Sequence, residues 1–324
     1  MDTVNVAFVG AGNFARSHHY PTLSRMDDVR VVAIAELNED LLHETADRYG
    51  VPGRYVDYHE MLAREDVDAV YVIMPPHGLR PIVLDVIAAG KHVFTEKPAG
   101  MNTAETAEMA RAAEQAGVKS AVGCNRRYCH VIRKAKAEVL LEGPISTVLA
   151  EFHKDMTGAP FGISVLYTDG LHVLDPMRYI LGEAESVHAH ADWWYTKDRW
   201  EASYNCFQAL IRFKGGGSGL FTANRQAGGR YERFEVHGRG ISAYVRAPDL
   251  VQIVRAGQDE AEVYTGEQLA GSSDERDTYG YFVESREFMD CIKNDAMPPT
   301  NFSDNVKTMQ LCDMIAAGSH RDMT

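Results

Sequence analysis

The chain has 324 residues, of which 45% are hydrophobic and 24% are charged, and this composition is that of an ordinary globular protein. Its length is sufficient for two hydrophobic cores, because single cores stop growing at roughly 250–300 residues. The net charge of −13 argues against a nucleic-acid backbone as the main partner, and no apolar run approaches the ~20 residues that cross a membrane.

The N-terminus and the cysteines bear on the cellular compartment. Residues 1–5 lack the basic flank and apolar core of a signal peptide, so we expect a cytoplasmic protein. The five cysteines are scattered and odd in number, and the close pair Cys124 and Cys129 has no accompanying histidine pattern at zinc spacing. We therefore expect free thiols in a reducing compartment and no metal site.

A glycine loop follows the first apolar run, residues 4–9. Gly10 makes the tight turn, Gly12 lets the backbone approach a pyrophosphate, and the small Ala15 lets helix and strand pack closely. A helix over residues 13–26 would point its N-terminal amides at a diphosphate. This pattern is typical of a dinucleotide-binding loop, although alone it is weak evidence.

Glu36 ends the second apolar strand, residues 29–35. It lies 21 positions after Ala15 (36 − 15), close to the spacing of ~20 expected for the acid that binds the ribose hydroxyls. An acid there repels a 2′-phosphate, so NAD is favoured over NADP. The alternative is a solvated acid at a strand end.

Apolar strands and helices then alternate as far as Gly123. The strands cover residues 69–74, the stretch from His92 and residues 118–123, and the helices cover residues 40–49, 79–89 and 102–116. This alternation predicts right-handed βαβ units and a doubly wound parallel sheet covered on both faces. Residues 1–123 should form a Rossmann-type α/β domain.

Consecutive β-type runs dominate the remainder, residues 124–324. Two helices, residues 128–141 and 169–181, flank a strand at 145–153, and further strands follow at 187–195, 205–213, 219–222, 233–238, 241–246 and 251–255. Strands without intervening helices predict an α+β domain with a large, mostly antiparallel open sheet. Two last helices, residues 279–293 and 304–317 with Ser303 as cap, are free to pack back on the first domain.

Glu96-Lys97-Pro98 stands where the strand from His92 ends. The carboxyl edge of a parallel strand is where open α/β sheets bind ligands, and the proline restricts Lys97 to extended conformations. The alternative is a turn with a solvated lysine. Asn125, Arg126, Arg127 and Tyr128 leave the last strand of this domain at the same edge, so we expect one or two of them to contact substrate or cofactor and the others to be domain-interface charges.

Together these motifs resemble the glucose-fructose oxidoreductase/inositol dehydrogenase/rhizopine-catabolism (Gfo/Idh/MocA) family over essentially the whole chain. The residues that carry the resemblance are Gly10-x-Gly12-x-x-Ala15 with His18, Glu36, Pro75 with His77, Glu96-Lys97-Pro98, Gly123-x-Asn125-Arg126-Arg127 and Gly170-x-His172-x-x-Asp175.

The resemblance implies a Rossmann domain and a second domain whose open sheet forms homodimers or homotetramers. It also implies hydride transfer between nicotinamide and a secondary alcohol or carbonyl of a sugar or cyclic polyol. In such proteins the lysine contacts the nicotinamide ribose and the substrate oxygen, and the Lys-Pro bond is commonly cis. The implied cofactor residues are Gly10, Gly12, Asn13, Phe14, Ala15, Glu36, Pro75, His77, Glu96 and Lys97, and the implied substrate residues are Asn125, Arg127 and Tyr128.

The proton chemistry is assigned to Lys97 and His172. Burial and a nearby cation lower the pKa of a lysine toward ~7–8, where it can act as an acid or base, and both influences are available at Lys97. Relatives often carry an aspartate four residues before the histidine, where this chain has Thr168. Asp169, one place later, still reaches the same helix face. It is therefore a third catalytic candidate, with helix N-cap as its alternative, and Asp175 is expected to be structural.

Two other functions stay open. The first is NAD-dependent, redox-assisted glycoside hydrolysis, and the second is a catalytically silent NAD-binding sensor or regulator, which gains weight from Thr168. Trp193-Trp194-Tyr195 could stack on a sugar, but alternation along a strand favours a place in the core or a subunit interface.

Overall fold

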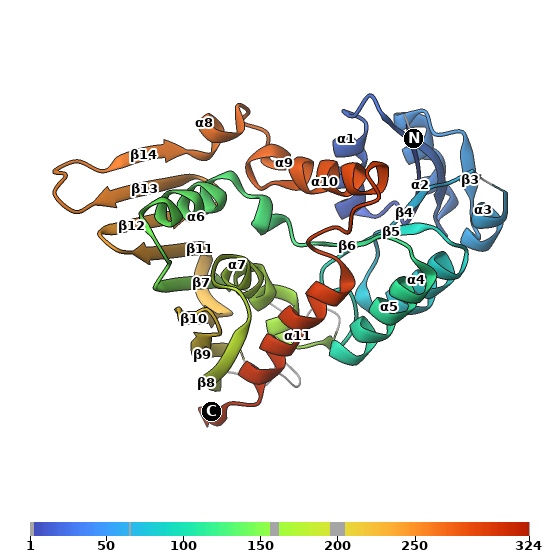
Figure 1. The fold of residues 1–324 in the computed structure, drawn as a ribbon. Helices are drawn as coiled ribbons and strands as arrows, with labels where there is room; N and C mark the ends of the chain where they lie inside the picture. The colour runs from blue at the N-terminus through green and yellow to red at the C-terminus, as the bar shows by residue number, and fades with distance from the viewer. Residues whose placement is uncertain (1–2, 65, 156–161, 195–204, 324) are drawn as a thin grey trace. The chain divides into compact units, whose positions relative to one another are not determined.

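The computed structural model describes residues 3–64, 66–155, 162–194 and 205–323, and these pack into two compact units (Figure 1). The first unit comprises Met1–Gly123 and Tyr281–Val306, and the second comprises Cys124–Gly280 and Lys307–Thr324. Within the described residues, none of the helices has the length and hydropathy needed to span a bilayer.

The first unit contains a parallel sheet that, among the described residues, has six strands in the order β3-β2-β1-β4-β5-β6. The strands are β1 (Val4–Val9), β2 (Val29–Ala35), β3 (Gly53–Tyr55), β4 (Ala69–Val72), β5 (His92–Glu96) and β6 (Ser120–Gly123). The order reverses between β1 and β4, as in a dinucleotide-binding Rossmann fold. The prediction of a doubly wound parallel sheet is confirmed.

Two helices of this unit, α2 (Glu39–Tyr49) and α5 (Thr103–Ala116), have both a side-chain cap and a glycine end. The other helices of the unit are η1 (Ala15–His19, π-helical), α1 (Tyr20–Leu23), α3 (Tyr58–Arg64), η2 (Pro76–Gly78), α4 (Leu79–Ala88) and α10 (Tyr281–Lys293). The side chains of Asn38 and Asn102 cap α2 and α5, and Gly50 and Gly117 end them in the left-handed conformation.

Helices cover both faces of the first sheet. Side chains of α1 and α10 share a core with Phe8, Tyr71 and Phe94 of the strands, whereas α4 and α5 lie together on the other side (Figure 1). Asp28, just before β2, ties α10 to the sheet through ion pairs with Arg286 (2.6 Å) and Lys293.

The second unit contains a sheet of nine strands within the described residues, in the order β14-β13-β12-β11-β7-β10-β9-β8-β15. Its strands are β7 (Thr147–Asp155), β8 (Ala184–Trp194), β9 (Cys206–Phe213), β10 (Ser218–Asn224), β11 (Gln226–Gly238), β12 (Ile241–Arg246), β13 (Leu250–Arg255), β14 (Glu262–Thr265) and β15 (Ser319–Met323). The β10–β7 and β15–β8 pairs are parallel and the others antiparallel, so the predicted α+β fold is confirmed.

Helices lie on one face of the second sheet. The elements are η3 (Asn125–Tyr128), α6 (His130–Glu142), η5 (Leu166–Gly170, π-helical), α7 (Leu171–Leu181), α8 (Gly266–Ala270), α9 (Glu275–Thr278) and α11 (Phe302–Ala316). α6 and α7 pack against the inner strands (Figure 1). The opposite face carries large apolar side chains that stay exposed, namely Leu210, Leu220, Tyr231, Tyr244, Val254 and Val263.

Some elements differ from expectation. The predicted cap Ser303 is wrong, because α11 begins at Phe302 and the Asn301 side chain accepts the hydrogen bond from the Asp304 amide (3.0 Å). The N-cap alternative for Asp169 is also wrong, since Gly170 precedes α7 and no side chain caps it. Tyr195 and the side chains of Trp193 and Trp194 lie outside the described residues.

Candidate functional site

Gly10 and Gly12 serve two different physical needs in the loop after β1. Gly10 has a φ of +105°, and a Cβ there would lie 2.3 Å from the carbonyl oxygen of Ile73. A Cβ at Gly12 would meet no atom within 4 Å in the structure. Gly10 is thus required by the fold itself, whereas Gly12 leaves open space, which fits the close approach of a pyrophosphate.

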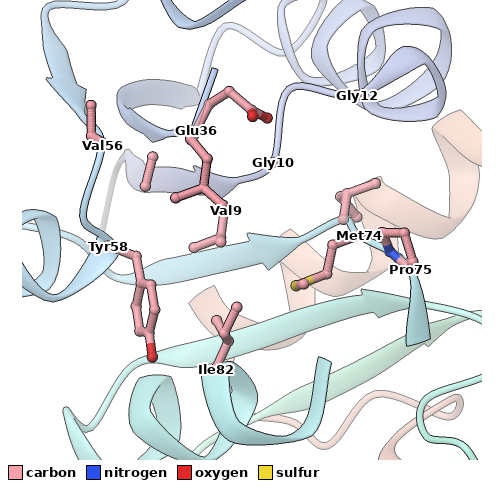
Figure 2. A pocket seen from close by; sticks show the side chains of 12 residues that line it. Val9, Gly10, Gly12, Glu36, Val56, Tyr58, Met74, Pro75 and Ile82 are labelled. Carbon is pink, nitrogen blue, oxygen red and sulfur yellow. The ribbon is translucent and has the colours of Figure 1, made fainter. Parts of the chain in front are cut away.

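A cavity of about 330 Å³ opens beside this loop (Figure 2). The Glu36 carboxylate, which Figure 2 shows turned toward the loop, accepts hydrogen bonds from the backbone amides of Ala11 (2.8 Å) and Asn38 (3.0 Å). An apolar wall beside a carboxylate and a glycine loop suits a dinucleotide. The cavity is lined by Val9, Gly10, Gly12, Ala35, Glu36, Leu37, Val56, Tyr58, Ile73, Met74, Pro75 and Ile82.

Other predicted cofactor residues lie outside this lining. Asn13 and Phe14 begin the helical segment after the loop, and the Phe14 ring stacks on His18 at 4.4 Å. Ala15 is fully buried, as close packing of helix and strand requires. His77 lies in the short helix η2. Glu96 and Lys97 form a separate corner at the end of β5.

The corner at the end of β5 is held by buried neighbours. The Lys97–Pro98 bond is cis, as the family resemblance implied, and Lys97 is half-buried. Glu96 Oε1 lies 2.9 Å from Nε2 of His19, which is fully buried, and Glu96 Oε2 accepts a hydrogen bond from the Lys97 amide (3.2 Å). A Cβ at Gly123 would come within 2.8 Å of the same carboxylate. Glu96 is therefore fixed in place directly beside Lys97.

His19 is a residue that sequence reasoning missed. It stands next to His18, which belongs to the family pattern, and that adjacency was the available signal. The hydrogen bond to Glu96 spans 77 positions of sequence, so no local spacing indicates it.

In the second unit, His172 lies in the first turn of α7, and Asp169 lies in η5 just before it. His172 is half-buried, with its ring 5.7 Å from the ring of Phe152 on β7. The Asp169 carboxylate lies 2.7 Å from the guanidinium of the fully buried Arg225, and Thr168 donates a hydrogen bond to it (3.2 Å). Arg225 is thus a partner that the sequence did not indicate, and a pairing of Asp169 with His172 stays a prediction.

The predicted substrate residues are occupied by structural contacts. Arg127 donates two 2.6 Å hydrogen bonds to Asp175, and the Asn125 amide donates to the Tyr279 carbonyl (3.1 Å). Asn125, Arg127 and Tyr128 are all more than 90% buried. Contact of these residues with substrate therefore stays a prediction. The buried ion pair with Arg127 agrees with the structural role expected of Asp175.

Comparisons with known proteins agree with these features. Residues 4–124 match the oxidoreductase family with an NAD-binding Rossmann fold, and residues 137–243 match the Gfo/Idh/MocA C-terminal domain. The chain is 31% identical over 247 residues to the myo-inositol 2-dehydrogenase of Thermotoga maritima, covering 72% of this chain and 73% of that protein. It is 30% identical over 310 residues to the inositol 2-dehydrogenase of Burkholderia cenocepacia, covering 91% and 88%.

A solved structure of levoglucosan dehydrogenase with NADH and L-sorbose shares the fold, with a TM-score of 0.84, 23% identity and coverage of 98% of this chain and 96% of that one. The two family models together span most of the chain. The chain belongs to the Gfo/Idh/MocA family of oxidoreductases and is an NAD(P)-dependent dehydrogenase or reductase of CH–OH groups.

Proposed function

We propose that this protein transfers a hydride between NAD and a secondary alcohol or ketone of a sugar, a sugar derivative or a cyclic polyol. The observation that carries the proposal is the corner at the end of β5, where Glu96 is fixed between His19 and Gly123 directly beside Lys97. The names of the relatives, inositol and levoglucosan dehydrogenases, support this substrate class.

Lys97 and His172 are proposed to handle the proton. Bound nicotinamide supplies the acceptor for the hydride that leaves the alcohol carbon. The hydroxyl proton passes to the amine of Lys97, and His172 shares this acid–base role. Glu96 orients the lysine by anchoring the backbone on which it sits. In ketone reduction the same groups return the proton to the oxygen.

NAD is proposed as the preferred cofactor. Glu36 lines the cavity of Figure 2, and its carboxylate is turned toward the glycine loop. A carboxylate accepts hydrogen bonds from the ribose hydroxyls and repels a 2′-phosphate.

The open face of the second sheet is proposed to form a homodimer or homotetramer. Leu210 and Leu220 face each other across β9 and β10 and are 48% and 44% exposed. With Tyr231, Tyr244, Val254 and Val263 they make this sheet face apolar over several strands, and such patches mark interaction sites. Leu220→Glu should shift the protein toward monomer in light scattering, whereas a mass unchanged by this charge would contradict the proposal.

A panel of sugars and polyols with NAD tests the function. Net NADH formation with at least one alcohol is the expected result. Cleavage of an aryl glycoside with catalytic NAD and no net NADH would indicate the hydrolase instead. Tight NAD binding with neither activity, and with Lys97→Ala altering only partner binding, would indicate the sensor.

A further inference from the structure

In the second unit, basic side chains lie around Phe152, the residue on whose ring His172 packs. Lys154 follows Phe152 by two residues on β7, so both side chains point to the same face of the sheet. That face is the one on which His172 lies, because its ring packs 5.7 Å from Phe152. The Arg225 guanidinium lies 5.9 Å from the same phenyl ring. We call Arg126, Lys154, Arg225 and Arg230 the cationic cluster.

The arginines of the cluster share two buried carboxylates. Arg225 pairs with Asp169 at 2.7 Å. Glu232 is bonded by Arg126 through both carboxylate oxygens (3.0 and 2.9 Å) and also by Arg230 (2.5 Å). Burial would raise the pKa of Glu232, but Arg126 and Arg230 together hold it below its usual value. The four cations thus share two buried carboxylates, those of Asp169 and Glu232, and the exposed Asp155 adds a third negative charge that acts on Arg225.

Lys154 is the cation in excess. It is half-buried, and among the described residues no carboxylate lies within ion-pair distance of its ammonium group. Burial lowers the pKa of Lys154, the charges of Arg225 and Arg230 lower it further, and those of Asp169 and Glu232 oppose them. The neighbouring Asp155 is exposed and belongs to the opposite face by strand alternation. Its charge acts on Arg225, so the cluster still carries one cation more than its carboxylates.

The two longer segments outside the described residues carry no net charge. Residues 156–161 contain no charged side chain, and in residues 195–204 Lys197 and Arg199 are balanced by Asp198 and Glu201. The whole chain carries a net charge of −13, so a local positive excess is opposite in sign to the protein around it. A half-buried cation without an ion-pair partner is costly to bury, and an anionic ligand would offset that cost.

We propose that the cationic cluster binds an anionic group of the substrate, with Lys154 and the outer edge of Arg230 as the contacting groups. Arg230 is suited to this because 45% of its side chain stays exposed while it bonds to Glu232. The alcohol is then a polyhydroxy carboxylate or a sugar phosphate, not a neutral sugar or inositol. This inference rests on the proposed dehydrogenase function and narrows its substrate class.

The test compares matched acidic and neutral alcohols in the wild type and in Lys154→Met. The pairs are gluconate with sorbitol, glucuronate with glucose, and glucose 6-phosphate with glucose, with NADH formation as readout. We expect the wild type to favour the anionic member at least ~10-fold in kcat/KM. Lys154→Met should lose ~10- to 100-fold on anions, mainly through KM, and change little on neutral alcohols.

Lys214→Met is the matched control, because Lys214 is an exposed lysine in the turn between β9 and β10 of the same unit. It should behave as wild type, and unchanged thermal melting should show that both variants fold. If the wild type prefers the sugar acids, the anion is a carboxylate; if it prefers glucose 6-phosphate, the anion is a phosphate. The inference is overturned if neutral alcohols react as well as their acids, or if Lys154→Met alters both classes equally.

Binding separates this inference from the proposed function. The same acids are titrated into NADH-loaded protein by calorimetry. Acid binding that is lost in Lys154→Met supports the inference even where no alcohol is oxidised, which would contradict only the dehydrogenase function. Oxidation of neutral alcohols with no acid binding contradicts only the inference.

Discussion

The cofactor loop of the first unit and the cationic cluster of the second unit are built in opposite ways. In the first, Gly10, Gly12 and Glu36 come from two adjacent strands, and backbone amides hold the carboxylate. In the second, Arg126 reaches Glu232 across 106 positions of sequence, and both side chains are buried. In the cofactor loop, backbone groups hold the functional side chain in place. In the cationic cluster, buried ion pairs between charged side chains are themselves part of the packed interior.

This difference separates function from stability. A side chain displayed at a strand end can be removed with little effect on folding, whereas removal of one partner of a buried ion pair leaves an uncompensated charge. Substitutions of displayed side chains in the first unit, such as Glu36 and Lys97, should therefore change cofactor binding or activity. Substitutions among the buried pairs of the second unit should change stability first.

Lys97→Ala should give the largest effect on activity. We expect kcat to fall about 10³-fold with thermal stability unchanged, because general acid–base groups contribute ~10²–10⁴-fold. Lys91→Ala is the control, since Lys91 precedes the amino end of the same strand. Steady-state NADH formation at saturating NAD measures the effect, and a Lys97 variant that keeps more than a tenth of wild-type kcat would remove the lysine from the mechanism.

Arg126→Met should instead destabilise the protein by about 3 kcal/mol or more, because Glu232 loses its bidentate partner in a buried site. Urea unfolding followed by circular dichroism measures the loss. The control is Arg233→Met, which removes a half-buried partner of Glu151 and should cost less than about 1 kcal/mol. Equal losses in the two variants would break the distinction between the regions.

Gly10→Ala and Gly12→Ala should separate an effect on folding stability from an effect on NAD binding within the same loop. Gly10→Ala should destabilise the apoprotein by about 1–3 kcal/mol, because the new Cβ meets the Ile73 carbonyl and φ is positive. Gly12→Ala should leave apoprotein melting unchanged and weaken NAD binding. Calorimetry with and without NAD checks both, and a stable Gly10→Ala protein that binds NAD normally would count against this account of the loop.

Glu36→Gln tests the cofactor preference without removing the acceptor for the Ala11 amide. We expect the wild type to bind NAD at least tenfold more tightly than NADP, and the variant to narrow that ratio by about tenfold, or ~1.4 kcal/mol. Fluorescence titration with NADH and NADPH gives both constants. A wild type that binds NADPH more tightly would overturn the role given to Glu36.

Asp28→Asn should have the smallest effect. Hydrogen bonds from Lys293 and Arg286 lower the pKa of Asp28 to about 2. The stabilisation is therefore complete above the usual pKa of the carboxyl, ~3.9, and is lost as the pH falls toward 2. At neutral pH the variant should lose less than about 1 kcal/mol, because the carboxyl is partly exposed. A difference from wild type that persists at pH 2 would contradict this cause.

Local signals in the sequence predicted the Rossmann strands, the glycine loop and the corner at Lys97. Asn38 stands at the N-terminal end of α2 and Gly50 at its C-terminal end, where capping rules place such residues. The three-residue strand β3 was missed because so short a segment has no measurable periodicity. Ser303 and Asn301 are both good cap residues two positions apart, and sequence alone could not rank them.

The partners of the charged side chains could not be predicted. Whether Asp169 faces His172 or Arg225 depends on the path of the chain after β10, and the π-helical turn before α7 moves Asp169 away from a cap position. The pairing of Glu232 with Arg126 requires the register of β11 against β7. Cross-strand register over long sequence separations is not encoded in local patterns.

The most direct test of the central claim is a double-mutant cycle on the single-turnover rate of NADH formation, with Lys97→Ala, His172→Asn and the double variant. Groups that act on one proton transfer are strongly non-additive. The account predicts that each single variant is slow and that the double variant is hardly slower than Lys97→Ala alone. Rate losses that multiply, or a His172→Asn protein as fast as wild type, would contradict a shared role for the two residues.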